Sequence, residues 1–360
     1  MRIYNFSSGP AMLPEPVLER AREEMLSLGG IGMSVMEISH RSDQFDLILH
    51  GAEQGIRDLL DIPSNYRVLF LQGGASTQFA MVPMTFLPKG SSADYVVAGY
   101  WGRKALAEAN REGSTRVIWN GEESGFSRIP SAGEIPFSPD AAYVHYTSNE
   151  TIDGVEFKYD LDAGEIPVIC DACSNVLSKP IDIGKYAMIY AGAQKNIGPS
   201  GVTVVIIRDD MIAKVPSGLH PLLDYRALAE SDSMVNTPNT WGIYLIGLIC
   251  DWLKEQGGVA GIQNKNEAKA KVLYDAIDSS DGFYRGRAER SARSTMNVTF
   301  NLQSAELERL FAEQAAEKGM DGLAGHRTSG GIRASIYNAF PAAGVDELIG
   351  FMQEFAAQNS

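Results

Sequence analysis

The chain has 360 residues, 44% of them hydrophobic, and a formal net charge of −14. This length and composition predict a folded protein with one large domain and a smaller companion, and they argue against disorder. The acidic balance argues against a nucleic-acid-binding protein, which needs a basic face, although a few clustered cations can still attract a small anion into a cleft.

No targeting or membrane segment stands out. The N-terminal residues contain no apolar stretch of signal-peptide length, and the most apolar helical candidate, residues 241–253, is too short to span a bilayer. Three cysteines give no even disulfide framework. We therefore expect a soluble protein of a reducing, cytoplasmic compartment, with no membrane partner.

The first two thirds of the chain alternate between helical and strand-like patterns. Amphipathic helices are predicted at 14–28 and 43–61. Short apolar runs follow, separated by helical patterns, at 66–72, 93–99, 115–119, 141–148, 165–172, 186–193 and 201–208. Runs that are apolar on both faces and separated by helices predict a mostly parallel sheet covered on both sides.

The pattern changes after an apolar helix at 239–256 and a long polar helix that follows it. A strand at 296–302, a helix at 304–319, a strand-like segment at 331–338 and a last helix at 342–357 predict a small α+β unit. We expect a large domain of residues 14–260 and a small domain of residues 1–13 and 261–360.

Ligands of open α/β sheets bind beyond the carboxyl ends of the strands, so the residues that follow each run carry the functional signal. Glycines at 73–74 and hydroxyls at Ser76 and Thr77 predict a phosphate-binding turn, or an ordinary strand-to-helix turn with a Ser/Thr cap. Trp101, at the start of a helix, could stack on a planar ligand or pack on the core.

Three further strand ends carry polar groups. Residues 149–151 form a polar turn that could equally be a surface loop. Asp171 directly follows a buried strand, where a carboxylate is costly unless it is paired. Lys195 stands at the mouth of a tight turn between two apolar runs, where a desolvated amine can attack carbonyls, although a lone loop lysine is usually just solvated.

Taken together, these groups match the needs of pyridoxal 5′-phosphate. The turn would take the phosphate, Trp101 would hold the ring flat, and Asp171 would keep the pyridine nitrogen protonated so that the ring accepts electrons. Lys195 would form the imine with the aldehyde, and the small residues around it, including Gly198, would leave room for the ring.

Several motifs occur in the order seen in one enzyme family. They are FSSGPAMLP, ISHRS, GGAS, NETIDG, AGAQKNIGPSG, NTPNT, GHR and GGIRASIYNA, and they extend over nearly the whole chain. In these motifs the sequence resembles the phosphoserine aminotransferases, which belong to the class V group of fold-type I pyridoxal-phosphate enzymes. The resemblance implies a large domain with a mixed, mostly parallel sheet covered by helices, and a small α+β C-terminal domain.

The resemblance also implies roles for individual residues. Lys195 matches the catalytic Schiff-base lysine, Asp171 the pyridinium partner, and Trp101 the stacking residue. Asn236 and Thr237 match residues that reach the cofactor phosphate of a neighbouring subunit, which implies a homodimer with shared sites. The full set implied to contact the cofactor is Ala75, Ser76, Trp101, Thr151, Asp171, Gln194, Lys195, Asn236 and Thr237. Some relatives have Gly-Arg where this chain has Ala75-Ser76, so an arginine near the substrate is missing or replaced.

The implied reaction moves an amino group from L-glutamate to 3-phosphohydroxypyruvate and gives O-phospho-L-serine and 2-oxoglutarate. Glutamate and phosphoserine each carry an α-carboxylate and a second anionic group. Guanidinium groups bind both kinds of anion well through paired hydrogen bonds. Arg333 resembles the family's α-carboxylate arginine, and the pairs His40-Arg41 and His326-Arg327 resemble its distal-anion groups. Lys195 would also move the proton from Cα. Some relatives aminate a longer phosphorylated substrate in pyridoxine biosynthesis, giving 4-phosphohydroxythreonine.

Competing interpretations remain at this stage. The chain could instead be another class V enzyme, either a cysteine desulfurase or an alanine–glyoxylate aminotransferase. However, Cys250 lies in an apolar helix and Trp101 stands where desulfurases usually stack a histidine. A second competing interpretation is a non-catalytic α/β protein that binds an anionic metabolite. The pair Cys170 and Cys173 is expected to be small and buried, and no histidine spacing supports a metal site.

Overall fold

The protein was analysed as a computed structural model, which describes residues 2–359. Its largest element is a seven-stranded sheet with the strand order β2-β10-β9-β8-β5-β3-β4. The strands are β2 (Tyr66–Leu71), β3 (Ser92–Val97), β4 (Ser114–Asn120), β5 (Val144–Thr147), β8 (Val168–Asp171), β9 (Met188–Gly192) and β10 (Thr203–Arg208). All neighbouring pairs are parallel except those made by β10, so the expected mixed, mostly parallel sheet is confirmed.

The exception, β10, explains why the turn that carries Lys195 is so tight. An antiparallel neighbour can be joined by a short connection, whereas a parallel one needs a crossover of a dozen or more residues. Residues 193–202 make the short connection from β9 to β10, and Lys195 lies within it. The two apolar runs around Lys195 are therefore adjacent antiparallel strands in the middle of the sheet.

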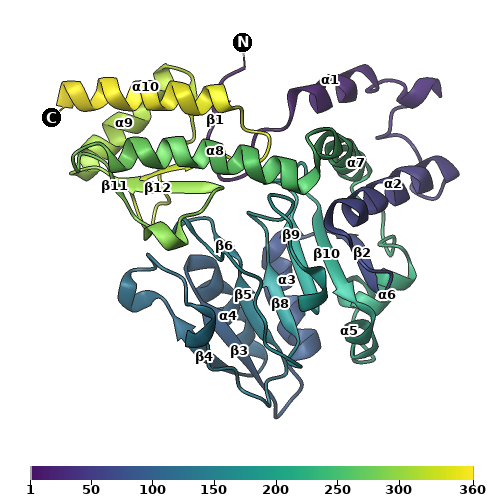
Figure 1. Ribbon diagram of the computed structural model, residues 1–360. Helices are drawn as coiled ribbons and strands as arrows, with labels where there is room; N and C mark the ends of the chain where they lie inside the picture. Colours follow the sequence, from purple (N-terminus) through teal and green to yellow (C-terminus); the bar gives the residue numbers. More distant parts are fainter. Residues whose placement is uncertain (1, 360) are drawn as a thin grey trace.

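Helices cover both faces of this sheet (Figure 1). Residues alternate between the two faces, so Val204 and Ile206 join one hydrophobic core while Val205 and Ile207 join the other. The first core is completed by α2 (Asp43–Leu60) and α7 (Thr240–Glu255), and the second by α3 (Gly74–Phe86), α4 (Tyr100–Glu112), α5 (Asp209–Ala213) and α6 (Tyr225–Glu230). This burial on both faces is what the continuous apolar runs predict.

One predicted helix is too long. The segment expected to be helical over 14–28 forms α1 only at Glu15–Glu23, and a short 3-10 turn, η1, follows at Leu28–Gly30. The helix ends at its C-cap Glu24, and Gly29 and Gly30 follow five residues later with positive φ angles. The apolar side chains of Leu26, Ile31, Met33 and Met36, which come after the helix, are exposed.

A second, smaller sheet is built from the C-terminal part. It consists of β11 (Arg285–Gly286), β12 (Asn297–Asn301) and β14 (Ile332–Ser335), all antiparallel, with α8 (Gly258–Asp278), α9 (Ala305–Glu317) and α10 (Ala342–Asn359) packed around it. The N-terminus joins this unit, because β1 (Tyr4–Asn5) pairs with β13 (Met320–Asp321) and Phe6 is part of its core. Figure 1 shows this unit above the end of the large sheet at which β6 (Asn149–Glu150) lies.

Helix α8 connects the two units. Ile262, near its start, packs into a core of the large sheet, whereas Ala270, Leu273 and Ile277 pack into the core of the small one. These separate cores support a large domain of residues 14–260 and a small domain of residues 1–13 and 261–360, and we keep this division as a proposal.

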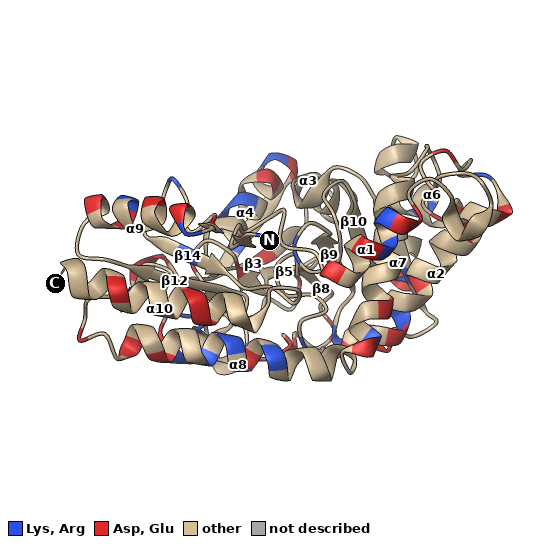
Figure 2. Cartoon of the chain, turned by 90° about the horizontal axis from the view of Figure 1, so that it is seen from above, with Lys and Arg blue, Asp and Glu red and all other residues tan. Residues whose placement is uncertain are grey.

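Charged residues lie mainly on the outer helices. Figure 2 shows both signs of charge interspersed along α8, a mainly acidic α9, and only Asp and Glu among the charged residues of α10. Strands β5 and β9, in the middle of the large sheet, contain no Lys, Arg, Asp or Glu. Within residues 2–359, no helix has the length and apolarity needed to cross a membrane.

Candidate active site

A cavity of about 150 Å³ lies at the carboxyl ends of β5, β8 and β9. Seven of the nine residues expected to contact the cofactor line it: Ala75, Ser76, Trp101, Thr151, Asp171, Gln194 and Lys195. The other lining residues are Gly74, Thr147, Asn149, Cys173 and Ser174. The cavity lies where the topology of an open α/β sheet predicts a ligand site.

Lys195 is half-buried in this cavity and is held by a single side-chain contact. Its Nζ donates a hydrogen bond to Thr151 Oγ1 at 2.7 Å and lies 6.0 Å from the centroid of the Trp101 ring. The amine therefore lies beside the aromatic plate, with no carboxylate within ion-pair distance among the described residues. An amine without an acidic partner at this distance is available to a ligand's carbonyl carbon.

Asp171 is the last residue of β8 and is 3% exposed. Its Oδ1 accepts a hydrogen bond from the backbone N–H of Cys173 at 3.0 Å, so the carboxylate also has a local structural role. Burial raises the pKa of this carboxyl, and the charge of Lys195 partly opposes the rise. A cationic ring nitrogen beside Asp171 would stabilise its ionised form further.

The N-terminus of α3 reaches the cavity without a capping side chain. Its N-cap is Gly73, with φ +90°, and the expectation that Ser76 and Thr77 cap this helix is wrong. Thr77 Oγ1 instead donates to the carbonyl of Gly73 at 3.0 Å, and a Cβ on Gly73 would lie 2.0 Å from that hydroxyl oxygen. The first N–H groups of α3 have no intrahelical partner, which suits an anion.

The turn at residues 149–151 is buried rather than a surface loop, and Glu150 within it and Asp153 just after it are two carboxylates to which sequence reasoning gave no role. Glu150 accepts hydrogen bonds from the backbone N–H groups of Trp101 and Gly102, at 2.9 and 2.8 Å. Asp153 accepts one from Tyr100 at 2.9 Å. Burial, with the charge of Asp153, raises the pKa of Glu150. These carboxylates cap α4 and hold Trp101 in place.

A sequence signal for this cap existed at Gly99. A Cβ there would lie 2.4 Å from Asp153 Oδ2 and 2.6 Å from Glu150 Cδ. The glycine that precedes the aromatic plate therefore leaves the space that the two carboxylates occupy.

Three of the predicted cations gather near the start of α4. Arg333 on β14 is 9% exposed, and its side chain makes no hydrogen bond or ion pair with any described residue. The His326 ring lies 5.2 Å from the Tyr100 ring. Partial burial lowers the pKa of His326, and the nearby charges of Arg333 and Arg327 lower it further. Arg327 is exposed on the same loop.

Four predicted residues lie elsewhere in the chain. His40 is half-buried and Arg41 is exposed in the segment before α2, while Asn236 and Thr237 are exposed in the segment before α7. Of the described residues that line the cavity, none belongs to these two segments. Thr237 is linked to the segment before α3, because Gln72, two residues before the cavity-lining Gly74, donates through its side-chain amide to the carbonyl of Thr237 at 3.2 Å.

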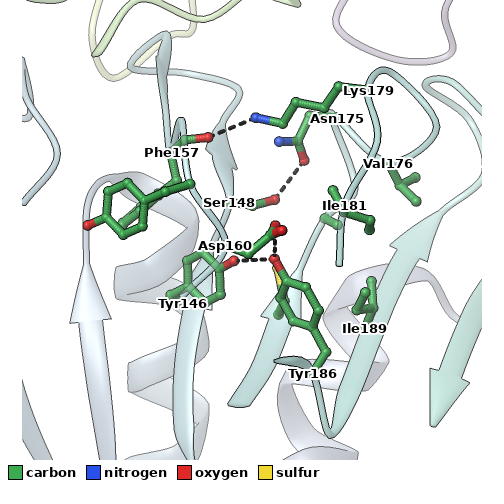
Figure 3. Close-up of a pocket in the computed structure, with 13 residues that line it drawn as sticks. Tyr146, Ser148, Phe157, Asp160, Asn175, Val176, Lys179, Ile181, Tyr186 and Ile189 are labelled. Carbon is green, nitrogen blue, oxygen red and sulfur yellow. Dashed lines mark hydrogen bonds between the residues drawn. The ribbon is translucent and has the colours of Figure 1, made fainter. Parts of the chain in front are cut away.

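A second, much smaller cavity of about 20 Å³ lies on the reverse face of the same strands (Figure 3). Its lining residues alternate with those of the first: Cys170 lines the small cavity and Asp171 the large one, as do Tyr146 and Thr147. It has room for little more than a water molecule. Cys170 and Cys173 therefore face opposite sides, and both are free and buried, as expected of small core cysteines.

The residues of the larger cavity fit pyridoxal phosphate. Thr147 Oγ1 and Asn149 Oδ1, both beside the cavity, are buried without any hydrogen-bond partner among the described residues. A buried polar atom without a partner is destabilising unless a ligand or water satisfies it. The uncapped helix, the buried carboxylate, the aromatic plate and the amine are complementary to a phosphate, a ring nitrogen, a ring face and an aldehyde.

Comparison with known proteins decides the family. The profile described as "Aminotransferase class-V" matches residues 3–348. A phosphoserine aminotransferase of Laribacter hongkongensis is 52% identical over 359 residues, which cover 100% of both chains, and one of Geobacillus kaustophilus is 49% identical over 98% of both. The chain belongs to the phosphoserine aminotransferases of class V.

Solved structures of phosphoserine aminotransferases agree. The enzyme of Bacillus circulans subsp. alkalophilus has a TM-score of 0.98 and 47% identity, covering 100% of this chain and 99% of its own. The pyridoxal-phosphate-bound enzyme of Trichomonas vaginalis has a TM-score of 0.92 and 37% identity, covering 98% and 100%. The cofactor of this phosphoserine aminotransferase family member is therefore pyridoxal 5′-phosphate, and the chain is an enzyme rather than a non-catalytic binding protein.

The alanine–glyoxylate alternative shares only the fold. Such an aminotransferase from Nostoc has a TM-score of 0.78 but 16% identity. Cys250, the residue on which a desulfurase assignment would depend, is fully buried in α7, and burial raises its pKa to about 12. A buried thiol of this kind is not a mobile nucleophile.

Proposed function

We propose that the chain transfers an amino group reversibly between L-glutamate and 3-phosphohydroxypyruvate, giving O-phospho-L-serine and 2-oxoglutarate in serine biosynthesis. The observation that carries the proposal is the side chain of Arg333, a buried guanidinium with no anionic partner among the described residues. A buried charge without a partner is costly, so the site is prepared for an anion that arrives with the substrate.

The neighbouring cations suit a substrate with two anions. Arg333 would take the α-carboxylate, which every substrate of this reaction has. His326 and Arg327 would take the second anion, a γ-carboxylate or a phosphate, because both can donate to either group. The loop that carries His326 and Arg327 can adapt to distal anions of different size. Arg333, on a buried strand, suits the α-carboxylate, which is the same in every substrate.

On the opposite side of the cavity, each lining residue has a role that follows from its chemistry. We propose that the uncapped start of α3, at Ala75 and Ser76, and the amide of Gln194 hold the phosphate. Trp101 would cover the ring, and Thr151 would contact its hydroxyl side. Asp171 would keep the ring nitrogen protonated, and the bound cofactor then supplies the electron sink that weakens the bond between Cα and its hydrogen.

Lys195 would have two tasks. It would hold the cofactor aldehyde until substrate arrives and then, as a free amine, would carry a proton from the substrate Cα to the cofactor carbon that had been the aldehyde carbon. Thr151, which accepts from Lys195 Nζ at 2.7 Å, would keep the released amine within reach of that carbon. Trp101 would exclude water from one face of the reacting atoms.

We propose further that the enzyme is a homodimer with shared active sites. Asn236 and Thr237 are exposed and outside the cavity of their own chain, which fits residues that serve the cofactor phosphate of a second copy. His40, which is half-buried, and the exposed Arg41 also lie outside the cavity of their own chain. The exposed apolar side chains of Leu26, Ile31, Met33 and Met36 lie close to His40 in sequence and would be covered by that copy.

Two finer points belong to the same proposal. Three free buried cysteines fit a reducing compartment, and we place the enzyme in the cytoplasm. The exposed Arg327 loop would also accept the longer phosphorylated substrate whose amination gives 4-phosphohydroxythreonine in pyridoxine biosynthesis.

The test combines a label with a substrate comparison. Borohydride reduction of the enzyme loaded with cofactor, followed by peptide mass mapping, should place the cofactor adduct on the peptide that contains Lys195. Steady-state assays should show glutamate and phosphoserine as far better amino donors than alanine. An unlabelled Lys195 peptide would refute the catalytic lysine, and alanine outperforming glutamate would refute the substrates.

A further inference from the structure

A fully buried pair of asparagine side chains joins the cofactor cavity to the small sheet. Asn149, which lines the cavity and begins β6 (Asn149–Glu150), donates from Nδ2 to Asn297 Oδ1 at 2.8 Å. Asn149 is 2% exposed, and Asn297, the first residue of β12, is 0% exposed. In Figure 1, β6 lies at the end of the large sheet that faces β12.

From Asn297 the hydrogen bonds continue to the strand that carries Arg333. The Nδ2 of Asn297 donates to Ser335 Oγ at 3.0 Å and to the hydroxyl of Tyr337 at 3.1 Å. Ser335 lies two residues after Arg333 on β14, so both side chains are on the same face of that strand. The strand register pairs Asn297 with Ser335 and Thr299 with Arg333.

The other end of the asparagine pair, Asn149, belongs to the turn at residues 149–151, whose Thr151 accepts a hydrogen bond from Lys195. Asn149 also donates to Ser174 Oγ at 2.7 Å, and Ser174 Oγ donates back to the carbonyl of Asn149 at 2.7 Å. Two residues along the chain, Thr151 accepts from Lys195 Nζ. One amide side chain, that of Asn297, thus lies between the part of the chain that holds the amine and the part that holds the buried guanidinium.

We propose that Asn297 is a positioning residue that sets the distance and angle between Arg333 and the Lys195 side of the cavity. This inference rests on the proposed roles of those two residues. A substrate amino acid must place its carboxylate on Arg333 and its Cα beside Lys195 at the same time. Small displacements between two such groups weaken productive binding strongly, because the substrate cannot stretch to meet both.

An amide suits this position because it accepts and donates at once. Its Oδ1 takes the hydrogen of Asn149, while its Nδ2 serves Ser335 and Tyr337. A carboxylate would lose both donors, and an aliphatic side chain would lose all three bonds. A second contact, from Thr299 Oγ1 to the carbonyl of Asp153 at 3.0 Å, keeps β12 beside the turn when the amide is removed.

The experiment compares three variants as cofactor-loaded enzymes. For Asn297→Leu, which keeps the branching and the number of side-chain heavy atoms of the amide, we expect the KM for glutamate and for phosphoserine to rise about tenfold. The kcat should stay within about threefold, because saturating substrate restores the productive geometry. The dissociation constant of pyridoxal phosphate and the absorbance spectrum without substrate should not change, because no cofactor-lining residue is altered.

Binding of glutarate, a dicarboxylate without an amino group, distinguishes a positioning role from a general structural defect. A general defect would weaken glutarate binding as well. Glutarate needs the cations of the small sheet but not the amine, so its dissociation constant should change less than twofold in Asn297→Leu. Asn301→Ala, on the same strand, removes an amide that donates to Glu308 Oε1 at 2.8 Å, away from the cavity, and should behave as wild type throughout.

Ser335→Ala is the variant that keeps the test decisive if Asn297→Leu does not fold. It removes one of the two acceptors of Asn297 and should raise the KM for both amino acids two- to threefold. An unchanged KM in the folded variants would overturn the proposal, as would a parallel loss of glutarate or cofactor binding. Wild-type enzyme that fails to use glutamate would instead refute the proposed function itself, whatever the variants do.

Discussion

The two sides of the cavity are built in different ways. On the large-sheet side, the groups assigned to the cofactor lie at strand ends or helix starts and have buried partners, as Trp101 has in Glu150 and Lys195 in Thr151. On the small-sheet side, Arg333 is buried without a partner, and Arg327 is exposed on a loop. The groups on the first side are held in place by the protein, although Thr147 Oγ1 and Asn149 Oδ1 still lack the partners that a ligand would supply. The guanidinium on the other side has no partner until substrate binds.

This difference teaches what each side must do. The cofactor stays through every catalytic cycle, so the side chains that contact it can be held rigidly in place by the protein. The substrates arrive and leave with different distal anions, so the cations that meet them cannot be neutralised permanently by the protein. Changes on the first side should therefore reduce kcat, and changes on the second should raise KM.

The largest effect is expected from Lys195→Ala. Removing the amine removes both the cofactor attachment and the proton carrier, so kcat should fall by about 10⁴-fold or more. Turnover of phosphoserine by purified variant, in the presence of added cofactor, measures this. The control is Lys185→Ala, which removes an exposed lysine just before β9 and should leave the enzyme active. A wild-type rate for Lys195→Ala would refute its assignment.

Asp171→Asn should come next. The amide cannot stabilise a positive ring nitrogen, so we expect kcat to fall about 10²- to 10³-fold with a smaller change in KM. The matched control is Asp160→Asn, which changes a carboxylate on the reverse face of the sheet that accepts from the Tyr186 hydroxyl at 2.6 Å. Equal losses in both variants would mean that folding, rather than ring electronics, explains the effect.

Arg327→Ala tests the substrate side. Losing one charged hydrogen bond of about 1.5–3 kcal/mol should raise the KM for phosphoserine and glutamate about 10- to 100-fold and leave kcat nearly unchanged. Steady-state kinetics on both amino acids measures it, with Arg309→Ala on the exposed side of α9 as the control. A fall in kcat without a change in KM would contradict the division between the two sides.

The smallest effect concerns stability, at a carboxylate that joins the two units. Buried Glu156 accepts from Lys179 and Lys158 and from the backbone of Thr295. Burial alone would raise its pKa, but the two lysines outweigh burial and lower the pKa from 4.5 to about 2. The folded state thus gains stability above pH 4.5 and loses it as pH falls toward 2, by about 1.4 kcal/mol at pH 3.5.

Urea unfolding at pH 6 and pH 3.5 measures that contribution. The difference in unfolding free energy between wild type and Glu156→Gln should narrow by this amount at the lower pH. Glu354→Gln, which alters an exposed partner of Lys318, should show a constant difference from wild type. A Glu156 difference that does not depend on pH would show that the lysines do not hold its ionised form.

Much of the fold was predictable because its signals are local. Apolar runs at 186–193 and 201–208 became β9 and β10, and the helix expected at 43–61 became α2. The end of α1 was less predictable, because the helix stops at Glu23 although the predicted helical pattern extends to residue 28. At the site, Lys195, Asp171 and Trp101 could be singled out since each follows a strand, the point at which such sheets bind ligands.

What escaped sequence reasoning was contact between residues far apart in the chain. The cap of α4 by Glu150 and Asp153, about 50 residues away, and the bond between Asn149 and Asn297 leave no periodic pattern. Nor does sequence tell that Arg333 is buried without a partner while Arg327 is exposed.

By itself, the sequence determined the order of elements, the two-faced burial of the central strands and the chemical types of the groups at their ends, because these follow from local pattern and motif. Only the tertiary structure decided which polar groups satisfy one another and which await a ligand. That outcome depends on burial and distance between separate segments, and a hydrogen bond exists only where folding brings a donor within about 3 Å of an acceptor.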